Sequence, residues 1–382
     1  MRVMSGAVLG VLGGGQLGRM FVMAAQQLGY RVTVLDPAVD SPAGRTADDF
    51  ICADYADQPA LEKLGTQCAA ITTEFENIPA QSLRKLAKSC VVSPDAYSVS
   101  IAQNRITEKQ FLVTNGFTVA PFAVIQQQDV IATQDVADLL PGILKVSQFG
   151  YDGKGQMAVA SEAELIAAYA QLNHSICVLE KFMPLKSELS VVVARGNDGE
   201  LKTFPVSENQ HVNGILDISI VPARISPEFA EQVQGTACKI AEKLDYQGVL
   251  CVEFFVLQNN ELLINEIAPR PHNSGHYSID ACITSQFEQQ VRALCGLPLG
   301  ATTQHSAAVM VNLLGDLWQN GEPDWNLVLQ NPSAKLHLYG KTEARPGRKM
   351  GHYTVLTTDI NAALQQALAV KKQLEQKLIR NP

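Results

Sequence analysis

Residues 249–276 read VLCVEFFVLQNNELLINEIAPRPHNSGH and contain two strand patterns in succession. Residues 249–257 and 261–267 are apolar runs rich in β-branched, aromatic and leucine side chains, and Asn259-Asn260 lies between them. Asparagine tolerates left-handed backbone, so a two-residue turn at this pair would join the runs as a β-hairpin. The segment therefore predicts two neighbouring antiparallel strands.

A turn at that position places Glu253 directly opposite Glu266, with Cβ atoms about 5 Å apart on one face of the sheet. Like charges at such a distance destabilise a sheet, and a divalent cation such as Mg²⁺ would relieve the repulsion. The alternative is an offset hairpin in which both glutamates face solvent. We favour the metal site, because both strands are too apolar for an exposed hairpin.

The loop after the second strand is dense in polar side chains. Pro269 and Pro271 stiffen an extended segment around Arg270, which is followed by two histidines, an asparagine and a serine within residues 272–276. Next to a metal, such a loop predicts an anion and substrate site. The alternative is an ordinary polar surface loop.

The first hundred residues alternate strand and helix patterns. Residues 7–12 form an apolar run, a helical stretch covers about residues 19–28, and strand patterns follow at 30–36 and 69–73. This alternation predicts a parallel sheet with covering helices. Gly13-Gly-Gly-Gln-Leu-Gly18 with Asp36 is also typical of a dinucleotide-binding turn, so an NAD-dependent oxidoreductase is a rival interpretation. A tight strand-to-helix turn is the alternative.

The middle of the chain predicts an α+β unit dominated by antiparallel sheet. Strand patterns lie at residues 143–146, 178–181, 190–194 and 250–256. The glycine-rich residues 149–156 follow Lys145, and their backbone N–H groups are suited to phosphate oxygens. The spacing is not that of a Walker A loop, and an ordinary hairpin loop is the alternative.

The last part contains strand patterns near residues 307–313 and 334–339. A closing helix has Leu364, Leu368, Leu374 and Leu378 at helical spacing. Between them, residues 341–351 contain four basic side chains with glycines and a proline, which predicts a phosphate site or a solvated charge run.

Composition limits the possible functions. The 382 residues include 30 basic and 38 acidic side chains, a net charge of −8, which disfavours binding to nucleic acid or anionic membranes. No apolar run is long enough to span a membrane, and no signal-peptide cleavage site follows Arg2. Eight scattered cysteines without a Cys-x-x-Cys indicate reduced thiols, so we expect a cytoplasmic protein.

Taken in order, these features resemble the 5-(carboxyamino)imidazole ribonucleotide synthase family of the ATP-grasp superfamily. The resemblance is carried by residues 13–20, 73–79, 150–156, 265–276 and 348–352, and it covers almost the whole chain. It implies a Rossmann-like N-terminal domain (residues 1–107), an ATP-grasp domain (108–297) and a small C-terminal domain (298–382). The implied fold is α/β and α+β.

The resemblance also implies which residues bind ATP and Mg²⁺. The implied ATP ligands are Arg105, Lys145, Gly150, Tyr151, Asp152, Gly153, Lys154, Gly155, Gln156, Glu180, Lys181, Phe182, Met183, Glu188, His211, Asn265 and Glu266. Glu253 and Glu266 would hold magnesium. Many ATP-grasp enzymes have an asparagine where this chain has Ala268, so a complete metal shell is not implied.

The implied reaction is ATP- and bicarbonate-dependent carboxylation of aminoimidazole ribonucleotide in purine biosynthesis, through carboxyphosphate. Tyr151, Asp152, Lys154, Arg270 and His272 would act in catalysis. The ribonucleotide would contact Gln16, Leu17, Glu74, Asn273, Ser274, Lys341, Arg348 and Lys349. The family also implies a homodimer. A formate-dependent ATP-grasp transformylase and a non-catalytic nucleotide sensor are further alternatives.

Overall fold

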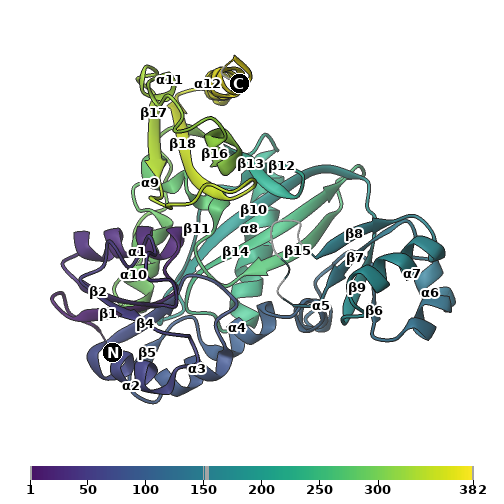
Figure 1. Ribbon diagram of the computed structural model, residues 1–382, viewed down its shortest axis with the longest axis horizontal. Coiled ribbons are helices and arrows are strands. Elements are labelled where there is room, and N and C mark those ends of the chain that lie inside the picture. The colour runs from purple at the N-terminus through teal and green to yellow at the C-terminus, as the bar shows by residue number, and fades with distance from the viewer. Residues whose placement is uncertain (1, 149, 151–154, 381–382) are drawn as a thin grey trace.

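The structure is a computed structural model that describes residues 2–148, 150 and 155–380. Within those residues, the strands form one parallel sheet and two antiparallel sheets. Figure 1 shows the parallel sheet near the N-terminus at the lower left, the smaller antiparallel sheet on the right, and the larger one between them and the top.

The N-terminal unit is a parallel sheet in the order β3-β2-β1-β4-β5. Its strands are β1 (Val8–Leu12), β2 (Arg31–Asp36), β3 (Asp49–Cys52), β4 (Ala70–Thr73) and β5 (Val91–Val92), and its helices are α1 (Gln16–Gln27), α2 (Gln58–Gln67), α3 (Ala80–Leu86) and α4 (Ala96–Ala102). Side chains alternate along β1: Leu9 and Val11 pack with α1, whereas Leu12 packs with α2 on the other face. The predicted parallel sheet with covering helices is confirmed.

A helix from much later in the chain completes this unit. In α10 (Gln286–Leu294), Phe287, Val291 and Leu294 join the same apolar cluster as α1. Beyond its end, the Cys295 carbonyl accepts a 2.9 Å hydrogen bond from Val3 N–H. The N-terminal core therefore includes residues from the central part of the chain.

The smaller antiparallel sheet has the order β6-β9-β7-β8. Its strands are β6 (Phe122–Ile125), β7 (Gly142–Val146), β8 (Gln156–Val159) and β9 (Cys177–Lys181), and its helices are α6 (Gln134–Ala137) and α7 (Glu162–Gln171). Helix α5 (Arg105–Thr114) precedes this sheet in the chain. The strands predicted at 143–146 and 178–181 lie side by side as β7 and β9.

The larger sheet follows the order β15-β14-β10-β12-β13-β16-β18-β17, with β11 paired to β10. Its strands are β10 (Leu185–Arg195), β11 (Leu201–Thr203), β12 (Ser207–Val212), β13 (Ile215–Val221), β14 (Gly248–Leu257), β15 (Leu262–Ala268), β16 (Ala307–Leu314), β17 (Ala334–Leu338) and β18 (Lys349–Thr357). Helices α8 (Pro227–Lys243), α9 (Ser278–Ala281), α11 (Asn326–Leu329) and α12 (Ile360–Arg380) accompany it. Because β16 pairs with β13, the C-terminal strands extend the central sheet. This sheet continues across the predicted boundary after residue 297. The domain boundaries after residues 107 and 297 stay predictions.

Of the four leucines predicted at helical spacing in α12, Leu374 is buried in an apolar cluster and Leu364 packs against the same cluster. Ala363, Ala367, Val370 and Leu374 are buried against β13, β16 and β18, whereas Leu368 is 44% exposed. Small residues allow the helix to lie close to the sheet, and the leucine pattern alone did not reveal this.

Candidate active site

A cleft of about 730 Å³ lies where the N-terminal unit and the two antiparallel sheets meet. The predicted site residues that line it are Gln16, Leu17, Glu74, Arg105, Lys145, Gly150, Gln156, Glu188, His211, Glu253, Asn265, Glu266, Arg270, His272, Asn273 and Lys349. Segments far apart in sequence therefore converge on one cavity, as the resemblance implies.

Other predicted site residues lie elsewhere. Among the described residues, Gly155, Glu180, Lys181, Phe182, Met183, Ser274, Lys341 and Arg348 do not line the cleft. Tyr151, Asp152, Gly153 and Lys154 are outside the described residues, so their predicted phosphate and catalytic roles stay predictions.

The glycine turn between β1 and α1 is filled by the protein's own carboxylates. Asp36 accepts hydrogen bonds from Gly14 N–H and from the Tyr55 hydroxyl, each at 2.6 Å. Glu74 accepts one from Gly15 N–H and another, at 2.7 Å, from Gly18 N–H. These are the positions where a dinucleotide would place its ribose and pyrophosphate. The geometry therefore does not support the NAD-dependent interpretation.

A cluster of buried charges lies beside the cleft. Glu180 lies 3.1 Å from Lys145 Nζ and 3.2 Å from Lys109 Nζ, and all three side chains are almost completely buried. Burial favours the neutral amine and lowers the pKa of Lys145, although the charge of Glu180 opposes the shift. Glu180 thus neutralises two lysines, and its predicted place in an adenine pocket stays a prediction.

The other residues predicted to contact adenine and ribose lie in different environments. Lys181 and Phe182 are exposed, and Met183 packs against a small apolar cluster with Leu257 and Leu263. Glu188 Oε2 lies 3.0 Å from His211 Nδ1 at the cleft. Burial opposes protonation of His211, but the contact with Glu188 outweighs it and raises the pKa of the imidazole.

The acidic hairpin has the predicted pairing, with Glu253 opposite Glu266 on β14 and β15. Its loop is different, because Leu257 N–H donates to Glu261 O and only Asn260 adopts a left-handed backbone (φ 63°). The loop thus has three residues, 258–260, instead of the predicted two. A bulge then shifts the register between Glu253 and Phe254 and restores the predicted pairing of the two glutamates.

The bulge adds Asn265 to β15, and this residue lines the cleft beside the two acids. Asn265 Nδ2 lies 3.4 Å from Glu253 Oε2, and Arg105 Nη1 lies 3.2 Å from Glu266 Oε2. Burial, and then the charge of Glu266, raise the pKa of Glu253 to about 7. Hard carboxylate oxygens that repel one another in this way fit a hard divalent cation.

Sequence reasoning missed two acids in the cleft. Glu108 follows Arg105 by three positions on α5 and therefore shares its helix face, which was the available signal. Burial raises the pKa of Glu108 to about 8, with Glu266 adding to the shift. Glu76 lies two residues after the predicted Glu74, and its Oε2 accepts a 2.6 Å hydrogen bond from Arg270 Nε.

The polar residues of the loop after β15 differ in whether they line the cleft or are buried beneath it. His272 and Asn273 line the cleft, whereas Ser274 is fully buried beneath them. Asn273 exchanges two amide hydrogen bonds, of 3.0 and 2.8 Å, with Asn312 on β16. Ser274 therefore does not occupy the substrate-facing position that we predicted.

The basic stretch contributes one lining side chain. Lys349, at the start of β18, lines the cleft. Arg348 Nη1 donates instead to the Glu343 carbonyl at 2.7 Å, and Lys341 Nζ donates to the Lys349 carbonyl at 2.7 Å. The hydrogen bonds of Arg348 and Lys341 stabilise the loop itself.

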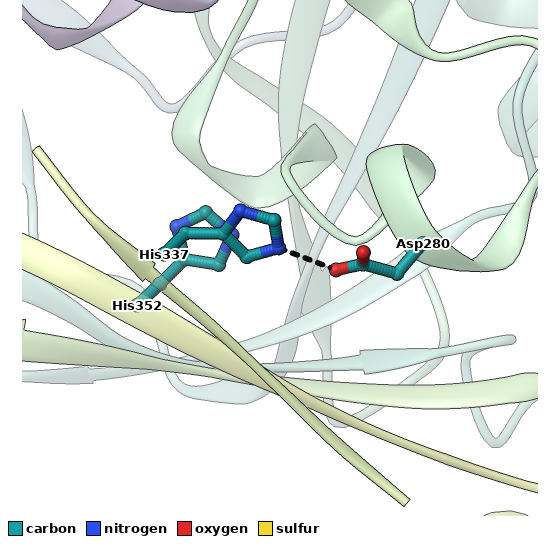
Figure 2. Close-up of side chains that lie close together, drawn as sticks. All are labelled: Asp280, His337 and His352. Atoms are coloured by element: carbon teal, nitrogen blue, oxygen red, sulfur yellow. Dashed lines mark hydrogen bonds and ion pairs between the residues drawn. The ribbon is translucent and has the colours of Figure 1, made fainter. Parts of the chain in front are cut away.

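Figure 2 shows a second group of potential metal ligands, Asp280, His337 and His352. None of the three lines the cleft. The two histidine rings stack with centroids 4.6 Å apart and planes 15° apart. A metal lies close to the plane of each imidazole that binds it, so nearly parallel stacked rings do not converge on one ion. His337 Nε2 lies 2.8 Å from Asp280 Oδ2, and this contact joins β17 to α9.

Comparison with known proteins gives matches along most of the chain. Residues 6–103 match the ribonucleotide synthetase preATP-grasp domain, 110–287 the ATP-grasp domain, and 308–366 the phosphoribosylaminoimidazole carboxylase C-terminal domain. These ranges follow the order of the predicted parts.

Relatives and solved structures agree with these domain matches. A Bacillus subtilis (strain 168) protein named N5-carboxyaminoimidazole ribonucleotide synthase is 47% identical over 352 residues, 92% of each chain. A crystal structure of an ADP complex of N5-carboxyaminoimidazole ribonucleotide synthetase is 43% identical, with a TM-score of 0.91 and coverage of 98% of this chain and 99% of that one.

An Aspergillus clavatus N5-carboxyaminoimidazole synthase, solved with ADP and 5-aminoimidazole ribonucleotide, is 30% identical. Its TM-score is 0.89, and the match covers 97% of this chain and 99% of that one. Fold, domain order and sequence identity over nearly the full length thus agree, and this chain belongs to the N5-carboxyaminoimidazole ribonucleotide synthase family of ATP-grasp enzymes.

Proposed function

We propose that this protein uses ATP and bicarbonate to carboxylate the exocyclic amine of 5-aminoimidazole ribonucleotide, releasing ADP and phosphate. The observation that supports this most directly is the cleft that collects Lys145 from the smaller sheet, the Glu253–Glu266 pair from the acidic hairpin and Arg270 from the loop that follows it. The names of the relatives, and the ligands of the Aspergillus clavatus structure, support the same reaction.

The chemistry requires an activated carboxyl group. Bicarbonate is a poor electrophile, and phosphorylation by ATP converts it into carboxyphosphate, whose carboxyl carbon the amine can attack. Fixed positive charges stabilise the negative charge on the transferring phosphoryl group. We assign Lys145 and Arg105 to the ATP phosphates and Arg270 to the bicarbonate side of the cleft.

We also propose that Glu253 and Glu266 hold Mg²⁺. The two carboxylates lie opposite each other, and the charge of Glu266 contributes to the raised pKa of Glu253, so a shared cation would relieve their repulsion. When bound, the ion would neutralise charge on the ATP phosphates. Asn265 supplies a side-chain amide next to the two glutamates. Ala268, at the position where many ATP-grasp enzymes have an asparagine, supplies none.

We propose that the ribonucleotide binds in the part of the cleft that is lined by residues of the N-terminal unit and the larger sheet. Gln16 and Leu17 start α1, Asn273 follows β15, and Lys349 starts β18, so these residues approach the cleft from the N-terminal unit and the larger sheet. Lys349 is the candidate for the phosphate of the ribonucleotide. Glu74 already accepts two backbone hydrogen bonds, so its role is to order the turn that presents Gln16.

The decisive experiment measures ADP release with aminoimidazole ribonucleotide and bicarbonate supplied separately and together. Full ATPase turnover is expected only with both, because unguarded carboxyphosphate would waste ATP. Equal ADP formation with bicarbonate alone would contradict the proposal. If formate replaced bicarbonate, the transformylase alternative would be correct, and a bound nucleotide without any turnover would indicate a sensor.

We also propose that the protein is a homodimer and is located in the cytoplasm. Family resemblance supports a homodimer, which sedimentation velocity tests directly. All eight cysteines are free thiols, which supports a cytoplasmic location, tested by fractionation. Among the described residues, no helix has both the length and the apolar character needed to cross a membrane.

A further inference from the structure

A series of buried hydrogen bonds leads from β13 to His272 at the cleft. Ser219 Oγ donates to Asn209 Oδ1 at 2.8 Å, and Asn209 Nδ2 donates to Ser190 Oγ at 2.9 Å. Ser190 Oγ in turn donates to Ser274 Oγ at 2.7 Å. Ser274 Oγ lies 2.9 Å from His272 Nδ1. We call these four residues before His272 the serine–asparagine series; each is at most 5% exposed.

A backbone amide identifies the direction of the last hydrogen bond. Ser274 N–H lies 3.3 Å from the same Nδ1 of His272, and a backbone amide can only donate. His272 Nδ1 is therefore an acceptor. The Ser274 hydroxyl, which already accepts from Ser190, has its own hydrogen left to donate to that nitrogen. An imidazole that accepts at Nδ1 has no proton on that nitrogen, so the ring proton of His272 is on Nε2.

That proton faces the acidic hairpin. His272 Nε2 lies 3.2 Å from Glu253 Oε1. The backbone of His272 is held as well, because its N–H donates to Gln286 Oε1 at 2.9 Å and its carbonyl accepts from Gln286 Nε2 at 2.7 Å. With the other tautomer, lone pairs of Nε2 and Oε1 would face each other, and Glu253 would lose this contact.

We propose that Ser274, supported by Ser190 and Asn209, is a positioning residue that fixes His272 as the Nε2–H tautomer, so that His272 orients the Glu253 carboxylate. Its effect on turnover rests on the proposed function, whereas the tautomer does not. The full burial of Ser274 excludes direct contact with substrate, so its side chain acts through the imidazole. Loss of a partner that fixes the tautomer of a metal-binding histidine typically costs about 10-fold to 100-fold in activity, and we expect a loss in the same range here.

The tautomer is tested by NMR on protein with ¹⁵N-labelled histidine, in which long-range ¹H–¹⁵N correlations identify the protonated ring nitrogen. His272→Gln assigns the signal among the seven histidines. We expect the Nε2–H pattern in the unmodified protein and a shift toward mixed tautomers in Ser274→Ala. A proton on Nδ1 in the unmodified protein, or an unchanged pattern in Ser274→Ala, would overturn the proposal.

Ser207→Ala is the matched control. Ser207 is a buried serine whose hydroxyl donates to the Ser274 carbonyl at 3.4 Å and does not belong to the serine–asparagine series. Ser274→Ala should lower kcat by about 10-fold to 100-fold with a much smaller change in KM for the ribonucleotide, whereas Ser207→Ala should preserve both kcat and the tautomer. Equal losses in the two variants would mean that general packing, and not the series, is responsible.

Ser190→Ala provides a second variant if Ser274→Ala does not fold. It removes the donor to Ser274 and should shift the tautomer in the same direction by a smaller amount; no shift would count against the proposal. If the unmodified protein shows no carboxylation, the proposed function fails, but the NMR comparison still decides the tautomer.

Discussion

Arg270 Nε donates to Glu76 Oε2 at 2.6 Å, a bond between residues 194 positions apart in sequence. Arg270 follows β15 and Glu76 follows β4, so this contact joins the acidic hairpin to the N-terminal unit. Both residues line the cleft, and the ion pair fixes where the guanidinium can lie. A charge-assisted hydrogen bond between the two parts of the chain therefore forms part of the cleft lining.

Glu76→Gln should lower the free energy of unfolding at pH 7 by about 1.5–3 kcal/mol, because it removes the charge from a hydrogen bond to a largely buried guanidinium. Urea denaturation measures this. The control is Glu62→Gln, which disrupts the exposed pair of Glu62 with Lys85 and should cost less than about 1 kcal/mol. Equal effects would show that the Arg270 pair behaves as a surface contact.

The same comparison predicts a pH dependence. Burial would raise the pKa of Glu76, but the charge of Arg270 outweighs it and lowers the pKa below the ordinary value of 4.5. A depressed carboxyl pKa stabilises the fold above the unfolded-state value and loses this stabilisation as the pH falls through the folded-state value. The difference in stability between the unmodified protein and Glu76→Gln should thus shrink as the pH drops below about 4.5.

Glu266→Gln should reduce turnover by about 100-fold or more, because it weakens stabilisation of the charge on the transferring phosphoryl group. Stability in chelator should change by less than about 1 kcal/mol. The substitution relieves repulsion from Glu253 but loses the partly exposed contact with Arg105, and each effect is small. Thermal melts in chelator check this, and a large destabilisation would mean that the Arg105 contact dominates.

Glu180→Ala should destabilise the protein by about 3–5 kcal/mol, since it leaves the buried amines of Lys109 and Lys145 without their shared carboxylate. Lys181→Ala, at the exposed neighbouring position, should change stability by less than about 0.5 kcal/mol. Denaturant titration of the two variants makes the comparison. Comparable losses would contradict the buried-cluster explanation.

Lys349→Ala should raise KM for aminoimidazole ribonucleotide about 10-fold to 100-fold, as expected for loss of a charge-assisted contact to phosphate, with a smaller change for ATP. Arg348→Ala should have the weaker effect on that constant, because its guanidinium is bonded to the Glu343 carbonyl. Steady-state kinetics with each substrate varied separate the two, and the reverse ranking would move the phosphate site to Arg348.

The features that could be predicted best from the sequence are those set by residues close together in the chain. The pairing of Glu253 with Glu266 was predicted correctly, but only because a longer loop and a bulge at Asn265 offset each other. Neither feature is encoded by alternation of apolar residues, because each depends on backbone conformation at one or two positions. Three of the five strands in the N-terminal unit, β1, β2 and β4, were predicted from apolar runs, whereas the short strands β3 and β5 were not.

Long-range contacts were beyond sequence reasoning. Asp36 and Glu74 have the residue types of ligand-binding acids, yet the fold directs both onto backbone N–H groups of the glycine turn. Ser274 lies between cleft residues in sequence, but the short 3₁₀ turn at Asn273–Gly275 directs its side chain into the interior. Such outcomes depend on which distant segments arrive at the site.

Because α10 packs against α1, the core of the N-terminal unit is completed only late in the synthesis of the chain. The apolar surface that Leu17, Met20 and Phe21 present is completed by Phe287, Val291 and Leu294. A ribosome adding roughly 5–20 residues per second reaches residue 295 about 15–60 s after starting the chain. Throughout that interval the nascent N-terminal unit lacks the part of its apolar core that α10 supplies.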